Sequence, residues 1–245
     1  MWCAIARPRD RASRGNARRT ENRSAVSRSR VLVAAAIGAG VLYLVGAVAL
    51  GSPPEATDSP ARVVAWLHEH HGAARVYAWT AALGTLAFAV VAGILRGTLP
   101  APAGDVFLLG AAAFIAETAV QAWCWAGLAL HGESLEPASA RLVLDVASFW
   151  GPILTGATTT MIGAVTVLGL RRAPLIPTWL IALGAIAFAE QAVETITVFG
   201  THGFIAPGGD MNLLLGAGLT AIWLGALVIW TALRLRGEAG ARAAT

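Results

Sequence analysis

The chain has 245 residues, of which 56% are hydrophobic and only 13% are charged. Soluble domains carry about 25% charged residues, so this composition excludes an ordinary water-soluble enzyme and a disordered protein. Two cysteines, Cys3 and Cys124, are too few for a disulfide scaffold or a cysteine-based zinc finger. The composition therefore predicts an all-α, polytopic membrane bundle.

The positive charge is concentrated at the N-terminus. All 18 basic residues are arginines, and nine of them lie in the first 30 residues, beside only two acidic residues. We expect residues 1–30 to form a disordered basic tail near anionic lipid headgroups, unless the start codon is assigned too far upstream. The remaining chain is more acidic than basic, so we expect no nucleic-acid partner.

Helices that cross a bilayer need about 20 apolar residues, and six stretches of the chain meet this length. A single transmembrane domain over 31–236 would hold them, with residues 237–245 as a second tail. The six predicted spans are 31–51, 74–95, 105–130, 140–170, 178–199 and 211–235.

The arginines predict the orientation, because cytoplasmic loops of membrane proteins are enriched in basic residues. With the N-terminus inside, 15 arginines lie on the cytoplasmic side and three on the outer side. We therefore expect both termini in the cytoplasm and a plasma-membrane location. A cleaved signal peptide is the alternative for the first span, but its apolar run of about 20 residues exceeds the usual 7–15.

Local signals add detail to the outer segments and to the fourth span. Ser59 and Pro60 are typical of a helix start, and we expect a short amphipathic surface helix over 60–71, ended by Gly72. Pro137 resembles another helix start. Pro152 is expected to kink the fourth span and to free a carbonyl near Ser148.

An internal repeat is suggested by two similar hexapeptides. The sequence AETAVQ at 116–121 resembles AEQAVE at 189–194. The offset of 73 residues aligns 74–130 with 147–203 and gives two helix pairs in the same orientation, as in transporters with parallel repeats. Chance similarity between alanine-rich helices is the alternative.

Four carboxylates fall inside the predicted spans: Glu117, Asp145, Glu190 and Glu194. Glu117 and Glu190 each lie 12 residues into their spans, which at 1.5 Å per residue is about 18 Å, near the bilayer midplane. Gln121 and Glu194 lie one turn further out on the same faces. Intramembrane ionisable groups are expensive and usually functional.

We expect these groups to line a polar cavity that opens outward among the last four spans. No arginine is expected to reach the midplane and neutralise these acids, so at least one of Glu190 and Glu194 would be protonated near neutral pH or bound to a cation. The alternative is a neutral carboxylic acid that joins helices through Gln121 or a threonine. Polar stripes support the cavity on the fourth span (Asp145, Ser148, Pro152, Thr155, Thr159) and on the sixth (Asn212, Gly216, Thr220, Trp223).

All five histidines fall in the predicted outer segments, where histidine and carboxylate side chains could bind Zn or Cu. Polar residues avoid spans in any case, so their location is also expected by chance. No cofactor is predicted beyond this metal option. Its candidate ligands are His68, His71, His131 and His202, with His70 and the nearby acids Glu69, Glu133 and Asp210.

Residues 31–236 resemble a family of six-helix membrane proteins of unknown function, common in GC-rich Gram-positive bacteria. The resemblance is carried by RLVLD at 141–145, by Arg171-Arg172, and by PTWL at 177–180. The family often has a glycine soon after this Trp-Leu pair, whereas Ile181 follows here. The resemblance implies a plasma-membrane helical bundle and no particular reaction.

Three functions remain open from the sequence. The first is a non-enzymatic bundle that binds or moves a small cation or polar solute, using Glu117 and Glu190 with Gln121, Asp145 and Glu194. The second is a membrane enzyme with a metal site on its outer face. The third is a structural or regulatory protein whose carboxyls lock helices together. A homodimer is plausible for a bundle of this size.

Overall fold

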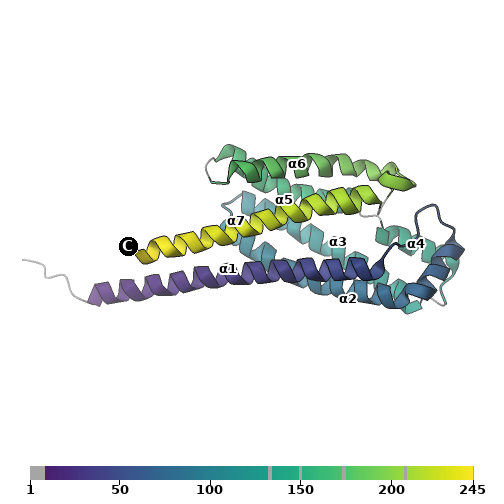
Figure 1. The fold of residues 1–245 in the computed structure, drawn as a ribbon, viewed down its shortest axis with the longest axis horizontal. Coiled ribbons are helices and arrows are strands. Elements are labelled where there is room, and N and C mark those ends of the chain that lie inside the picture. The colour runs from purple at the N-terminus through teal and green to yellow at the C-terminus, as the bar shows by residue number, and fades with distance from the viewer. Residues whose placement is uncertain (1–8, 132–133, 149–150, 173–174, 207–208, 245) are drawn as a thin grey trace, which may run out of the picture.

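The computed structural model describes residues 9–131, 134–148, 151–172, 175–206 and 209–244. Within these ranges the chain is helical and contains no strand, which confirms the all-α prediction (Figure 1). The α-helices are α1 (Arg9–Leu50), α2 (Pro60–Thr98), α3 (Ala103–His131), α4 (Pro137–Ser148), α5 (Gly151–Arg171), α6 (Thr178–Glu194) and α7 (Ala217–Ala244). The shorter helices are η1 (Thr195–Phe199), η2 (Gly203–Ile205) and η3 (Met211–Gly216).

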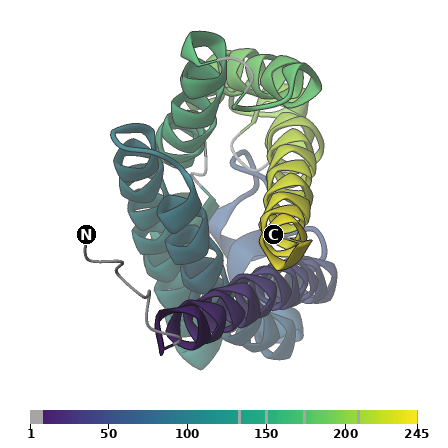
Figure 2. The same ribbon diagram turned by 90° about the vertical axis from the view of Figure 1, so that its left-hand side faces the viewer.

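Six long helices form a closed ring. Each packs against the next in the order α1, α2, α3, α5, α6 and α7, and α7 packs back against α1 (Figure 2). The short α4 lies outside this order, against α2 and α3. We call the end where α5 finishes and α6 starts the arginine end, because Arg96, Arg171, Arg172 and Arg234 lie there.

Five helices in the described part of the chain are long and apolar enough to cross a membrane. Large apolar side chains also cover their outer surfaces; Val48 is 73% exposed and Leu109 is 70% exposed. Exposed apolar surface on this scale is unusual in soluble proteins and is expected where lipid is the solvent. The five spans are Ser24–Leu50, Pro60–Thr98, Ala103–His131, Thr178–Phe199 and Leu214–Ala241.

The N-terminal segment differs from its prediction. Helix α1 begins at Arg9, so residues 9–30 continue the first span as helix, and the predicted disordered tail is wrong there. Adding residues to an existing helix is far easier than nucleating one, and alanine and arginine are good helix formers. Ser29 is buried and donates a hydrogen bond to the Ala232 carbonyl oxygen at 3.2 Å, which ties this extension to α7.

Helix α2 joins two elements that we expected to be separate. Ser59 caps it as predicted, its hydroxyl accepting from the Arg62 amide at 3.3 Å. The helix then runs through Gly72 without a break, so the prediction that Gly72 ends a surface helix is wrong. Gly72 lies in open space, and a helical glycine costs only about 1 kcal/mol. The buried side chains of Val63 and Leu67 hold this first part of α2 against its neighbours.

The predicted fourth span is two helices instead of one. Helix α4 opens at Pro137, as expected, and ends at Ser148, and α5 opens at Gly151. Ser148 is the residue four positions before Pro152, where a proline ring clashes with the helix carbonyl and its own N–H is missing. Residues 149–150 lie outside the described residues, so the kink expected at Pro152 stays a prediction.

The end opposite the arginine end carries irregular helical turns. The α6 helix tightens into the 3-10 turn η1, and η3, the entry to α7, is a turn of π-helix. π-turns occur frequently at functional sites. Here η3 brings Asn212 and Gly216 against the end of α6.

Candidate functional site

Two carboxylates share one amide at the end of α6 that lies opposite the arginine end. The Gln191 side-chain nitrogen Nε2 donates to Glu190 Oε2 at 3.0 Å and to Glu194 Oε2 at 2.7 Å. Gln191 and Glu194 are only 2% and 4% exposed. This arrangement confirms that Glu190 and Glu194 lie together, and Gln191 is the group that joins them.

Side chains from two neighbouring helices complete this group. The Thr158 hydroxyl of α5 donates to Gln191 Oε1, and the Asn212 amide of η3 donates to Glu194 Oε1. Both residues are buried. We call Thr158, Glu190, Gln191, Glu194 and Asn212 the carboxylate cluster. It connects α5, α6 and the start of the last span through side-chain hydrogen bonds alone.

The cluster holds two acidic groups and no basic one. Among the described residues, neither Glu190 nor Glu194 forms an ion pair. Both oxygens of Glu194 accept from amides, whereas Glu190 Oε1 is buried and has no hydrogen-bond partner there. A buried carboxylate oxygen without a partner is costly, so this atom is the position where a proton, a water or a cation is needed.

Sequence reasoning identified the two glutamates but only part of their surroundings. The predicted stripe of the sixth span faces inward as expected, since Asn212, Gly216 and Trp223 are buried. On α5 the predicted stripe named Thr155 and Thr159, whereas the contact with Gln191 comes from Thr158. Gln191 lies three residues before Glu194, a spacing that places both on one helix face and could have identified it.

Glu117 is separate from the cluster. It lies half-buried on α3, and its Oε2 atom is buried with no hydrogen-bond partner among the described residues. No hydrogen bond joins it to Glu190, and α5 packs against both α3 and α6. Glu117 and Glu190 therefore lie at two separate places in the ring and do not form a pair.

Gln121 has a structural contact. It accepts from the Tyr77 hydroxyl at 3.0 Å, and its Nε2 donates to the Ala147 carbonyl oxygen at 2.9 Å. Ala147 is in the last turn of α4, where backbone carbonyls lack helical partners. Gln121 therefore caps α4 and does not bond to a carboxylate.

Among the described residues, Asp145 is the one of the four predicted carboxylates that forms an ion pair. The Arg141 guanidinium pairs with Asp145 one turn away on α4, donating from both Nε and a terminal nitrogen. Arg141 also donates to the Glu55 carbonyl oxygen at 2.8 Å. The i, i+4 spacing of Arg141 and Asp145 was a signal for this pair. Asp145 is thus paired with Arg141, and Arg141 holds the loop before α2.

The histidines do not assemble into a metal site. In the described part of the chain no three His, Cys, Asp or Glu side chains come together as a possible metal group. His70 bonds through Nδ1 to the Trp66 carbonyl oxygen and stacks on the Trp66 ring at 4.5 Å. The other predicted ligands, His68, His71, His131 and His202, are exposed, and Glu133 lies outside the described residues.

Comparisons with known protein families, characterised proteins and solved structures find no match to this chain.

One feature links the two predicted repeat units. Glu117 and Glu190 occupy equivalent positions in the offset of 73 residues, and each has one buried carboxylate oxygen without a hydrogen-bond partner among the described residues. The next equivalent pair, Gln121 and Glu194, is hydrogen-bonded in both units. The repeat itself stays a prediction.

Proposed function

We propose that this protein is a plasma-membrane protein with six spans and both termini in the cytoplasm. Helix α5 would be the span that adds to the other five, because its 21 residues reach about 31 Å at 1.5 Å per residue. The arginine end would face the cytoplasm, in keeping with the distribution of basic residues. Membership of the six-helix family of GC-rich Gram-positive bacteria is part of the same proposal.

Within that bundle, the carboxylate cluster would bind a small cation or a proton and pass it across the membrane. The observation that supports this is the sharing of one Gln191 amide between Glu190 and Glu194, with no basic side chain paired to either. Two like charges this close in a low-dielectric interior repel strongly. A proton or a bound cation removes that repulsion.

The chemistry of the cluster favours a hard cation or a proton. Its available atoms are carboxylate, amide and hydroxyl oxygens, which suit ions such as Na⁺ or H⁺ and not soft metals. Glu190 Oε1 would be the first contact because it alone has no donor. The cluster lies toward the end opposite the arginine end, so in the proposed orientation the ion would enter from outside.

A second function is favoured by a specific observation. Both oxygens of Glu194 are satisfied by amides, and the contacts of Thr158 and Asn212 join three elements. The cluster would then be a structural clamp between helices, worth little more than other interhelical hydrogen bonds in membranes. The two functions differ in the role of Glu190. Among the described residues Glu190 bonds only to its neighbour Gln191, so it joins no two helices directly.

The deciding experiment is ion flux in proteoliposomes with an interior pH dye, under gradients of H⁺, Na⁺ or K⁺. Glu190→Gln removes the charge and keeps the shape, and it should abolish a flux that the unaltered protein supports. Glu69→Gln makes the same chemical change at an exposed position and should leave the flux unchanged. Undiminished flux in Glu190→Gln would refute the proposal.

Thermal unfolding in detergent then distinguishes the structural clamp from the ion site. As a clamp, Glu194→Gln and Glu190→Gln lower the unfolding temperature and change no ion property. As an ion site, Glu190→Gln raises or maintains the unfolding temperature, because it relieves repulsion with Glu194. Native mass spectrometry of the same samples tests for a retained ligand or metal and for the proposed homodimer.

A further inference from the structure

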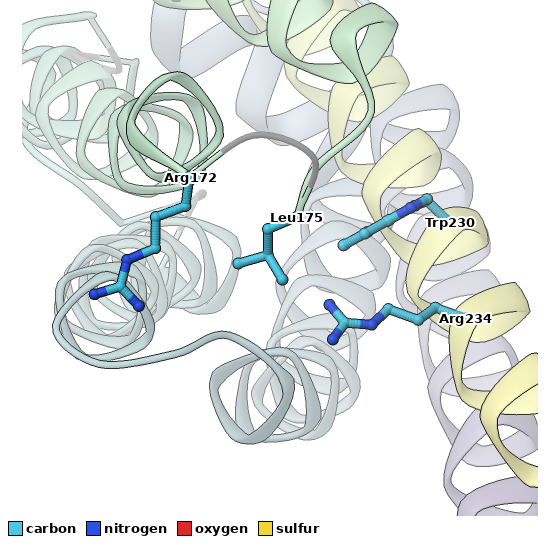
Figure 3. A pocket seen from close by; sticks show the side chains of 4 residues that line it. All are labelled: Arg172, Leu175, Trp230 and Arg234. Carbon is cyan, nitrogen blue, oxygen red and sulfur yellow. The ribbon is translucent and has the colours of Figure 1, made fainter. Parts of the chain in front are cut away.

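A pocket opens at the arginine end, far from the carboxylate cluster. Its volume is about 470 Å³, and it is lined by Arg172, Leu175, Trp230 and Arg234 (Figure 3). Arg172 directly follows α5, Leu175 precedes α6, and Trp230 and Arg234 lie one turn apart on α7. The lining thus combines two guanidinium groups with two apolar side chains.

Arg234 is held in position by its own helix. Its guanidinium carbon lies 5.7 Å from the centre of the Trp230 ring, and its Nε donates to Glu238 Oε1 at 3.0 Å. These contacts leave the two terminal nitrogens for another acceptor, and in Figure 3 they point toward the side of the pocket where Leu175 lies. Holding the group in place reduces the entropy lost when a ligand binds.

Arg172 is the second charge of the pocket. It is exposed, and no ion pair joins it to an acidic residue in the described part of the chain. Arg171 and Arg236 add further positive charge at this end, and the Arg236 side chain reaches Ser29 on α1 at 2.9 Å. The pocket is therefore a positively charged recess at the end of a helical bundle whose outer surface is apolar.

We infer that this pocket binds a phosphate group, as carried by the headgroup of an anionic phospholipid or by free phosphate. Guanidinium groups recognise phosphate oxygens in a bidentate manner. Basic pockets between helices at the membrane surface are suited to anionic headgroups. Trp230 belongs to the residue type enriched at the membrane interface. The inference does not depend on ion binding at the carboxylate cluster.

The test uses the full chain in a neutral detergent and native mass spectrometry with added phosphatidylglycerol or phosphatidylcholine. Arg172→Gln and Arg234→Gln remove one pocket charge each, and together they should weaken phosphatidylglycerol binding about tenfold or more, since each basic group adds several-fold. Arg171→Gln is the matched control, because it removes the same charge one residue away from the pocket lining. It should change the affinity less than about twofold.

Competition with inorganic phosphate identifies the source of the group. If millimolar phosphate displaces the lipid, the pocket takes phosphate from any source; if it does not, the pocket needs the lipid's glycerol and acyl chains. Equal weakening by Arg171→Gln and Arg172→Gln, or equal binding of phosphatidylcholine, would overturn the inference. Arg172 has no ion pair to lose within the described residues, so its variant tests the site without disturbing the fold.

Discussion

Gly216 of η3 lies against the carboxylate of Glu194, so closely that a Cβ at this position would overlap all three atoms of the carboxylate group. The same carboxylate accepts hydrogen bonds from Gln191 and Asn212. The glycine therefore provides the space in which Glu194 completes its contacts. A methyl group there would push the carboxylate away from both donors.

Gly216→Ala is expected to destabilise the protein by about 1–3 kcal/mol, the usual cost of overpacking an interior, and to abolish ion binding by the cluster. Thermal unfolding and the flux assay measure both effects. Gly218→Ala is the control, because a Cβ at Gly218 meets nothing within 4 Å. Alanine is the better helix former, so this control should be neutral or slightly more stable. Equal behaviour of the two variants would contradict the packing argument.

Thr158→Val keeps the shape of the side chain and removes the donor to Gln191 Oε1. A buried acceptor left without a partner costs about 1–3 kcal/mol, and the Gln191 amide becomes free to turn away from the carboxylates. We expect a lower unfolding temperature and weaker cation dependence of that temperature. Thr160→Val is the comparison, since Thr160 bonds only to the Gly156 carbonyl of its own helix. A similar loss in both variants would argue against a special role of Thr158.

Gln121→Leu tests the cap on α4. It removes the hydrogen bonds of Gln121 with the Tyr77 hydroxyl and with the Ala147 carbonyl oxygen. The expected loss of stability is about 1–3 kcal/mol. Tyr77→Phe removes one of these two bonds and should cost less. Thermal unfolding measures which of the two variants loses more stability. Ion flux should survive in both variants, because Gln121 bonds to no carboxylate among the described residues. Loss of flux with unchanged stability would place Gln121 in the ion path instead.

Acidification should loosen the start of α4. Glu136 accepts from the Ser139 backbone N–H at 2.9 Å and from its hydroxyl at 3.2 Å, and the backbone hydrogen bonds hold the pKa of Glu136 below its ordinary value. With the folded pKa below the unfolded one, the carboxylate's contribution is complete above the unfolded value of about 4.3. It is lost as the pH falls through the folded pKa.

The measurement for this prediction is the amide chemical shift of Ser139 between neutral and acidic pH. It should move only at pH values below the ordinary range of glutamate. In Glu136→Gln the transition should be missing, whereas Glu69→Gln should keep it. A transition at the ordinary glutamate pKa would show that the cap does not favour the ionised form.

The helices and the positions of the polar groups were largely predictable from the sequence. Runs of apolar residues are local features, and so are the helix starts at Ser59 and Pro137, both of which the structure confirms. The effect of helix-breaking residues was harder to predict from the sequence. Gly72 did not end α2, because packing against neighbouring helices decides how much a single breaker costs.

The sequence by itself determined that the chain is an apolar helical bundle with glutamates in its spans, because hydrophobicity and helical period are properties of consecutive residues. Only the tertiary structure decided which partners those glutamates have. The contact with Gln191 comes from Thr158, one position away from Thr159 of the predicted stripe, and a shift of one residue turns a side chain by about 100° around a helix. Asn212 meets Glu194 only because η3 packs against α6. Contacts between distant segments depend on how helices rotate and pack, and no local pattern in the chain specifies that.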